Sequence, residues 1–194
     1  KRRKKMKQFE LTSETKINIF GKKLFRIKAL ISFGVVKTGE TGGWVEKEEN
    51  VNQSGNAWVS GNAEVFGNAR VSGNAEVSGN ARVFDNAEVF DNAWVSGNAR
   101  VFGNAEVSDN AWVSGNAEVS DNADYATIHG FGTQFRTTTF FRCKDKQVKV
   151  SCGCFYGTIP EFREQVKNTR KGKIAEEYLM IADLMEKHFA EEAK

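Results

Sequence analysis

The sequence predicts a mainly β fold, in which a stem of stacked short strands joins an N-terminal β cap to a C-terminal α+β module. Two observations lead to this prediction. A six-residue phrase, GNAxVx with Asp at times in place of Gly, occurs twelve times without interruption over residues 55–126, and the composition changes on both sides of it. Short repeats bury their apolar face by stacking on neighbouring repeats. We therefore divide the chain into residues 6–54, 55–126 and 127–194.

Within each repeat, side chains alternate between the two faces of a short strand. Ala63 and Val65 share one face, whereas Glu64 and Phe66 share the other. The Gly-Asn pair supplies a corner, because Gly adopts positive φ freely and Asn tolerates it better than most residues. We expect the Ala and Val positions to form the core and the two variable positions to form the outer surface.

The strict six-residue period resembles that of the hexapeptide-repeat proteins. This resemblance implies a left-handed parallel β-helix of triangular section, with three hexads in each coil. Twelve hexads then make about four coils, in which residues eighteen apart in the sequence stack on one another.

Stacking at eighteen residues groups the outward side chains into columns. One column holds Trp58, Glu76, Trp94 and Trp112; a second holds Phe66, Phe84, Phe102 and Ser120; a third holds Glu64, Arg82, Arg100 and Glu118. Outward aromatic columns form an apolar patch, and such patches usually mark contact with something. The candidate binding residues are Trp58, Trp94 and Trp112 as stacking surfaces, Arg82 and Arg100 as a cationic pair, and Phe66, Phe84 and Phe102.

Two kinds of occupant fit these columns. The terminal segments of the same chain, or a second copy in a homo-oligomer, could cover them, because small stems often need such partners. Otherwise a host protein or a small-molecule ligand binds there. The sequence leaves both alternatives open.

Residues 6–54 are expected to cap the stem, because the end of a coil exposes unpaired backbone groups. Alternating side chains and turn residues define the cap. The expected elements are strands at 9–11, 17–20 and 25–30, a turn at 20–24, a loop at 39–43, and a first irregular coil with Trp44, Val45 and Val51.

The C-terminal module is predicted to begin with two strands, at 135–143 and 148–156, with Cys143 opposite Val148. That register places all three cysteines on one face with the apolar residues. Cys143 and Cys152 would then lie ~13 Å apart along the sheet, whereas zinc–sulfur bonds are ~2.3 Å. We therefore expect reduced core cysteines, with no metal and no cofactor.

Two helices are predicted to follow. Thr158 and Glu161 form a capping box around Pro160, so the first helix starts at residue 159 and runs to about 167. A basic loop at 168–173 precedes a helix at 174–190. Its apolar stripe, expected to pack on the hairpin or the stem, contains Ile174, Tyr178, Ile181, Met185 and Phe189.

The first five residues are all cationic and precede Met6. Codons for Lys-Arg-Arg-Lys can contain a bacterial ribosome-binding sequence, so our hypothesis is that residues 1–5 are a translated leader. Without them the formal charge changes from +3 to −2, which offers no electrostatic footprint for nucleic acid. No apolar run approaches the ~18–20 residues of a membrane span, and no signal-peptide pattern is present. We expect the cytoplasm of a bacterial host.

Four segments outside the repeat carry a second resemblance. They are FELT at 9–12, GGWVEKEEN at 42–50, TTFFRC at 138–143 and CGCF at 152–155. Together they resemble a group of uncharacterised phage and prophage proteins with a hexapeptide stem between such ends. The resemblance implies a viral or mobile-element origin and supplies no established active site.

Three classes of function follow. Hexapeptide acyltransferases and carbonic anhydrases depend on imidazole, but His129 and His188 lie outside the coils, so we assign no catalytic residue. A structural, polymer-forming protein needs an exposed coil edge, which the expected caps remove. We favour a non-enzymatic accessory binding protein that sequesters a host factor or a small signalling molecule in counter-defence.

Overall fold

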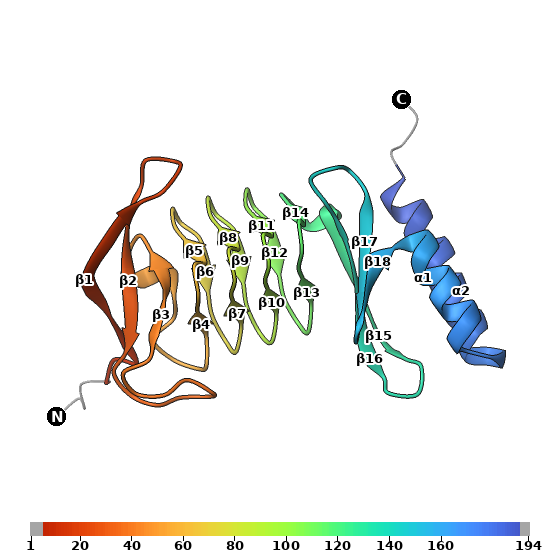
Figure 1. Ribbon diagram of the computed structural model, residues 1–194, viewed down its shortest axis with the longest axis horizontal. Helices are drawn as coiled ribbons and strands as arrows, with labels where there is room; N and C mark the ends of the chain where they lie inside the picture. The colour runs from red at the N-terminus through yellow and green to blue at the C-terminus, as the bar shows by residue number, and fades with distance from the viewer. Residues whose placement is uncertain (1–5, 191–194) are drawn as a thin grey trace.

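The computed structural model describes residues 6–190, so the predicted translated leader at residues 1–5 lies outside the described residues. The molecule is elongated, with the N-terminal cap, the stem and the C-terminal module following one another along its long axis (Figure 1). The predicted fold class is confirmed: stacked parallel coils form a stem of about four turns, followed by an antiparallel sheet and two helices.

The stem consists of eleven two-residue strands, one from each of the first eleven hexads. They are β4 (Trp58–Val59), β5 (Glu64–Val65), β6 (Arg70–Val71), β7 (Glu76–Val77), β8 (Arg82–Val83), β9 (Glu88–Val89), β10 (Trp94–Val95), β11 (Arg100–Val101), β12 (Glu106–Val107), β13 (Trp112–Val113) and β14 (Glu118–Val119). Strands from successive coils pair in parallel, with Trp94 opposite Trp112, which confirms the predicted stacking of residues eighteen apart.

Small apolar side chains fill the stem, and polar side chains build its corners. Every Ala and Val in these eleven hexads has at most 1% of its surface exposed. At the corners, asparagines of successive coils bond side chain to side chain, as from Asn56 to Asn74 at 2.9 Å. The Gly position has positive φ throughout, and Asp85 adopts the same conformation, with φ of 60°. Corner and core positions therefore match the prediction from the hexad.

The twelfth hexad, residues 121–126, is not part of the coils, and this corrects the prediction of twelve stacked hexads. It forms a short turn, η2 (Asn122–Asp124), and then enters β15. Asp124 accepts a bond from the backbone nitrogen of Ser120 (2.9 Å). Tyr125, which replaces the repeat Val, donates its hydroxyl to the Glu106 carbonyl (2.7 Å). Tyr125 is larger than the Val that it replaces, and it packs against the stem core at the point where the chain leaves the coils.

The N-terminal cap extends one sheet of the stem. Its elements are β1 (Phe9–Ile17), β2 (Lys23–Ala29), β3 (Thr41–Val45) and η1 (Glu48–Asn50). β1 and β2 form an antiparallel hairpin, and β3 joins β5 in parallel, giving the order β1-β2-β3-β5-β8-β11-β14. Val51 bridges Val71. The predicted first irregular coil is therefore confirmed.

Two details of the predicted cap are wrong. The strands expected at 9–11 and 17–20 are one strand with a register shift, and Phe20 lies in the turn that Asn18 closes by accepting the Phe20 and Lys22 amides. The loop expected at 39–43 contains the start of β3. A Cβ at Gly42 would lie 2.5 Å from the Ile27 side chain and 2.6 Å from Trp58, so this glycine serves close packing in a strand.

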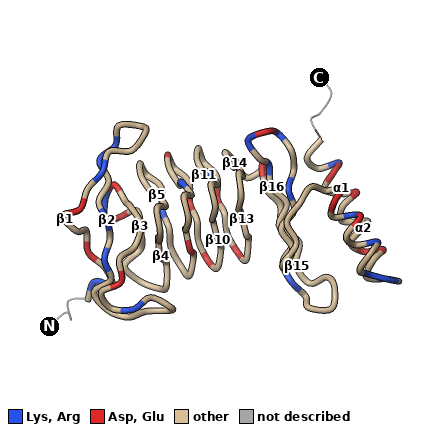
Figure 2. The backbone as a smooth tube through the Cα atoms, viewed as in Figure 1, with Lys and Arg blue, Asp and Glu red and all other residues tan. Residues whose placement is uncertain are grey.

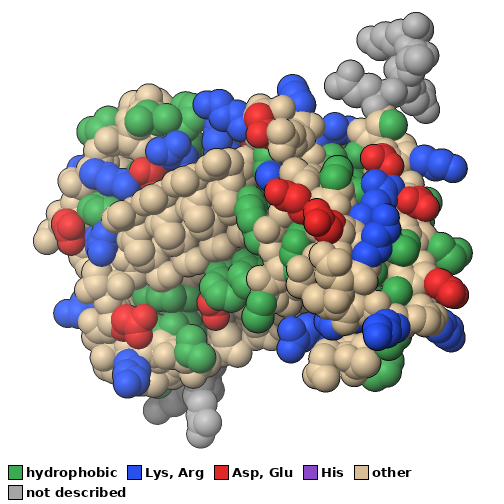
Figure 3. All heavy atoms as spheres, turned by 45° about the vertical axis from the view of Figure 1, so that its right-hand side comes forward, with side chains coloured by type: hydrophobic (Ala, Val, Ile, Leu, Met, Phe, Trp, Pro, Cys, Tyr) green, Lys and Arg blue, Asp and Glu red, His purple; other side chains and the backbone are tan. Residues whose placement is uncertain are grey.

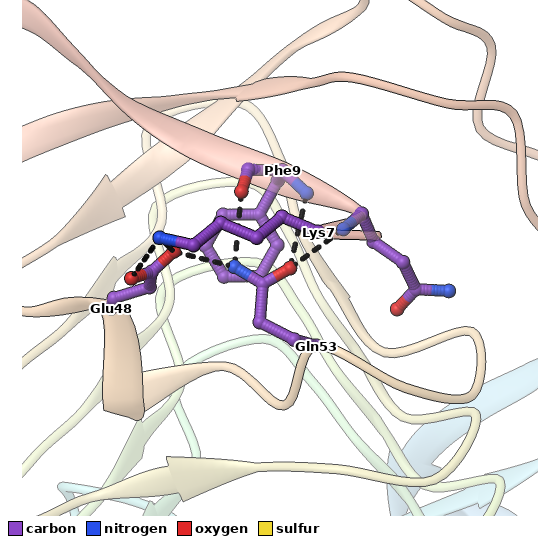
Figure 4. A network of polar contacts seen from close by, with 5 residues as sticks. Lys7, Phe9, Glu48 and Gln53 are labelled. Carbon is purple, nitrogen blue, oxygen red and sulfur yellow. Dashed lines mark hydrogen bonds and ion pairs between the residues drawn. The ribbon is translucent and has the colours of Figure 1, made fainter. Parts of the chain in front are cut away.

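The Gln53 side-chain amide hydrogen-bonds the start of β1 to the segment that follows η1 (Figure 4). Its Oε1 accepts the backbone amides of Gln8 (2.7 Å) and Phe9 (3.2 Å). Its Nε2 donates to the Phe9 carbonyl (3.0 Å) and to Glu48 (2.8 Å), which also pairs with Lys7. One side chain thus satisfies backbone groups as a neighbouring strand would.

The C-terminal module is a four-stranded antiparallel sheet with two helices on the side facing away from the stem (Figure 1). Its elements are β15 (Tyr125–Phe131), β16 (Arg136–Arg142), β17 (Val148–Cys152), β18 (Phe155–Thr158), α1 (Ile159–Thr169) and α2 (Gly172–Phe189). Phe141 and Cys143 pack into the stem core, whereas Phe140 and Val150 pack under the helices. The sheet therefore separates two cores.

The predicted register of this hairpin is wrong by one residue, because Arg142 rather than Cys143 lies opposite Val148. A shift of one residue exchanges the two faces of a strand. Cys143 is therefore buried against the stem, Cys152 packs on the helix side and Cys154 is exposed. The predicted second strand also bends at Gly153 into β17 and β18, and β15 was not predicted.

The helix predictions are largely confirmed. Thr158 and Glu161 form the capping box of α1, in which Glu161 Oε2 accepts the Thr158 amide at 2.7 Å. The predicted stripe of α2 packs on the sheet and α1, as expected. The predicted basic loop at 168–173 is shorter, because α1 extends to Thr169 and α2 begins at Gly172. No helix within residues 6–190 is both long enough and apolar enough to cross a membrane.

Candidate functional site

The first tryptophan of its column is covered by the N-terminal cap. Only 5% of Trp58 is exposed. Its indole packs in T-shaped contacts with Phe9, with ring centroids 6.3 Å apart, and with Phe33, at 5.6 Å. Its Nε1 is buried and has no hydrogen-bond partner among the described residues. Trp58 is therefore part of the contact between cap and stem, and it is not available to a partner.

The turn between β1 and β2 covers the first two rings of the phenylalanine column, Phe66 and Phe84. Phe66 and Phe84 stack with centroids 5.1 Å apart and an interplanar angle of 3°, and Phe84 stacks on Phe102 in the same way. Phe20 lies over the first two rings, at 5.4 and 5.3 Å. Phe66 and Phe84 are buried, and Phe102 is half-buried.

The predicted cationic pair is neutralised within the chain. Arg82 and Arg100 are neighbours across β8 and β11, but each has a carboxylate partner. Glu64 is 7% exposed, and its carboxylate forms an ion pair with Arg82 Nε at 3.4 Å. It forms a second ion pair with Lys16 Nζ of the cap at 2.8 Å. Arg100 pairs with Glu118. The two arginines therefore belong to a charged ladder that ties the cap to the stem, rather than to an open anion site.

Trp94 and Trp112 form the open part of the tryptophan column, which we call the tryptophan platform. Their rings stack with centroids 5.0 Å apart and planes 5° apart. Trp94 is 40% exposed, and Trp112 is half-buried. Each indole Nε1 donates to a serine of the preceding coil: Trp94 to Ser78 (3.0 Å) and Trp112 to Ser96 (3.4 Å). The serines hold the rings in one orientation.

The platform lies between the covered first coils and the C-terminal module. The backbone nitrogen of Trp112 donates to Thr139 of β16 at 3.0 Å, so the module begins directly beside it.

Figure 3 shows one face of the molecule, on which charged side chains gather over the two ends and are sparse over the regular rows of the stem. In the tube view, both signs of charge are interspersed along the stem and the helices (Figure 2).

The cysteines and histidines do not form a metal centre in the part of the chain that the structure describes, where no group of three or more His, Cys, Asp or Glu could hold an ion. The pKa of Cys143 is raised to about 11, chiefly because the thiol is buried and also because Asp145 is nearby. His129 Nδ1 lies 3.2 Å from the Thr137 hydroxyl on an exposed surface.

Comparison with known proteins adds no assignment to this geometry. No protein-family model matches the chain, and no curated protein sequence matches it. The structure itself divides the predicted site residues. It brings Trp94 and Trp112 together at the surface, and it places Trp58, Phe66 and Phe84 beneath the cap.

Phe20 and Phe33 are the residues that sequence reasoning missed, since they decide which parts of the columns are covered. Phe20 lies in a turn and Phe33 in the segment between β2 and β3. Aromatic side chains in such connecting segments are a usable signal, because a large ring there gains free energy only by covering another apolar surface.

Proposed function

We propose that the protein is a non-enzymatic binding protein whose stem presents the tryptophan platform to a partner. The observation that supports it is the contrast within one column: the cap buries Trp58, whereas Trp94 and Trp112 stay open, stacked and hydrogen-bonded in place. Rigid, partly exposed aromatic side chains supply large contact area at low entropic cost.

The partner class is the finer part of the proposal. We propose a host factor or a small signalling molecule, sequestered by a phage- or prophage-encoded accessory protein. Its contact with the platform is an aromatic or aliphatic group laid against the indole faces, because stacked rings offer apolar area and one polar edge each. The indole nitrogens are already engaged with serines, so recognition rests on ring faces.

The structural alternative is supported by the fold itself, since a parallel β-helix is a rigid rod. End-to-end growth would have to use the outer edge of β1, where no partner strand lies among residues 6–190. Glu10 and Glu14 place exposed charges along that strand, a feature that opposes edge pairing. At the other end β16 covers the last coil, with Cys143 bridging Ala117. We therefore place the polymer role second.

An acyltransferase role has no comparable support. Within residues 6–190, the one hydroxyl–imidazole contact is between Thr137 and His129; it is exposed, and no carboxylate of these residues hydrogen-bonds that imidazole. A nucleophile needs a base that a third group orients.

The test is native mass spectrometry of protein expressed in a bacterial host. We compare the wild type, the double variant Trp94→Ala/Trp112→Ala, and the control Glu88→Ala, which alters an exposed stem position on another sheet. A retained mass that persists in the control and disappears from the folded double variant supports the proposal and identifies the partner, including a second copy of this chain. Equal retention in all three proteins, or none in the wild type, contradicts it.

A further inference from the structure

The C-terminal module contains a pocket that is separate from the tryptophan platform. It has a volume of about 460 Å³ and lies between the β17–β18 turn and the two helices. Small-molecule sites typically have volumes of ~300–1,000 Å³ and combine apolar walls with a few polar groups. This pocket has both kinds of lining, and the proposed function does not use it.

The apolar wall is aromatic. Phe155 and Phe162 have ring centroids 5.5 Å apart, and Phe162 and Tyr178 meet edge to face at 5.7 Å. Tyr178 is fixed by its hydroxyl, which donates to the Phe131 carbonyl at 3.2 Å. Phe162 and Tyr178 are buried, whereas Phe155 is half-buried, so the wall is preformed and Phe155 is the ring of the three that a ligand can reach.

Two arginines supply the polar side of the pocket. Arg136 begins β16, and Arg170 directly follows α1. Neither forms a salt bridge within residues 6–190, and no carboxylate from these residues lines the pocket. Arg170 Nη1 donates to the Thr169 carbonyl at 3.2 Å. Among residues 6–190, the pocket thus holds two positive charges without a counter-charge, unlike the neutralised Arg82 and Arg100.

Both guanidinium groups act electrostatically on the Tyr178 hydroxyl. The pKa of Tyr178 is raised, chiefly by burial and next by the neighbouring Cys152 thiol, whereas the positive charges of Arg170 and Arg136 lower it. Arg136 also lies close over the turn: a Cβ at Gly153 would be 2.5 Å from its Nη1, and Gly153 has φ of +60°. The turn therefore leaves room for that guanidinium.

We propose that this pocket binds a nucleoside monophosphate, with the phosphate between Arg136 and Arg170 and the base against the aromatic wall. Guanidinium groups bind phosphate oxygens in a bidentate manner. A phosphomonoester carries a charge of about −1.5 to −2 at neutral pH, which matches two guanidinium groups, whereas a carboxylate matches one. Inorganic phosphate alone would leave the aromatic wall without a contact.

Calorimetric titration tests the proposal with adenosine 5′-monophosphate, inorganic phosphate and adenosine as separate probes. The variant Arg136→Ala/Arg170→Ala removes both charges. The control Lys167→Ala/Lys187→Ala removes two exposed charges, one from α1 and one from α2, outside the pocket lining. We expect the monophosphate to bind the wild type and the control equally, and the arginine variant at least ~10-fold more weakly, the effect of losing ~1.4 kcal/mol.

Other outcomes overturn the proposal. They are no binding of the monophosphate at millimolar concentration, equal binding by folded wild type and arginine variant, or adenosine or phosphate alone binding as tightly as the monophosphate. The exposed Cys154, which lines the pocket, supplies a second readout. Saturating monophosphate should slow its alkylation, and an unchanged rate argues against occupancy. Trp94→Ala/Trp112→Ala should bind the monophosphate as the wild type does, so failure of the platform proposal is distinguishable.

Discussion

The first and second halves of the stem are built from the same hexad, but their outward aromatic side chains have different environments. In the first half, the β1–β2 hairpin and the segment after it cover the sides of the coils, so that Trp58, Phe66 and Phe84 are buried. In the second half, β16 covers only the end of the last coil, and Trp94 keeps 40% of its surface exposed. The repeat places an aromatic side chain outward, and the neighbouring segments decide whether it stabilises the fold or remains available.

The largest difference is expected between two alanine substitutions in one column. Trp58→Ala removes a ring packed between Phe9 and Phe33 and should lower the free energy of unfolding by about 3–5 kcal/mol. Trp94→Ala loses its stack on Trp112 and its hydrogen bond to Ser78, each worth about 0.5–1.5 kcal/mol. Urea denaturation of both variants measures the difference. Equal losses would mean that the cap does not distinguish the two halves.

The charged ladder supplies the next test. Glu64→Gln keeps the shape of a buried side chain but removes the charge shared by Lys16 and Arg82, so we expect a loss of about 1.5–3 kcal/mol. Glu118→Gln breaks a more exposed pair with Arg100 and should cost below about 1 kcal/mol. Denaturation at two salt concentrations checks both values, because exposed pairs are screened more strongly. A larger loss for Glu118→Gln would reverse the comparison.

A smaller effect is expected from the turn of the cap. Phe20 is 46% exposed and lies over Phe66 and Phe84. Phe20→Ala should cost about 0.5–1.5 kcal/mol and increase the binding of a fluorescent apolar dye to the stem. Its neighbour Ile19, which is 74% exposed, gives the control Ile19→Ala, for which neither quantity should change. If dye binding stays constant in both variants, the turn does not cover the column.

The smallest perturbation is chemical labelling of the cysteines, which tests the cover over the last coil. The pKa of Cys143 is raised from 9.0 to about 11, so at pH 8 its thiolate fraction is ~100-fold below that of an ordinary thiol. Peptide mapping after alkylation should show rapid modification of the exposed Cys154 and slow modification of Cys143. Cys154→Ser should remove the rapid phase. Rapid labelling of Cys143 in the folded protein would show that β16 leaves the coil end open.

The same thiol gives a pH dependence with a defined sign. Because the folded-state pKa of Cys143 lies above the ordinary value of 9.0, the unfolded chain releases this proton first. Its contribution to stability is therefore complete below about pH 9 and is lost as the pH rises through about 11. Cys143→Ser should reduce that slope in denaturation experiments across the interval.

The accuracy of sequence-based prediction also differs between regions. In the stem, a shift of one residue would move every Ala and Val out of the core, so the repeat permits one register and the columns were predicted correctly. In the β16–β17 hairpin, apolar residues occur on both faces because the sheet separates two cores, with Phe141 on one side and Phe140 on the other. Alternation therefore did not define the register, and the prediction was wrong by one residue.

The sequence by itself determined the coiled stem, its core, its corners and the identity of its outward columns, because these depend on contacts that recur every eighteen residues. It also determined the start of α1, where Thr158 and Glu161 act locally. Only the tertiary structure decided which half of each column is open, how Arg82 and Arg100 are neutralised, and that Arg136 and Arg170 both line one pocket. These features depend on contacts between segments far apart in the chain, which no local period encodes.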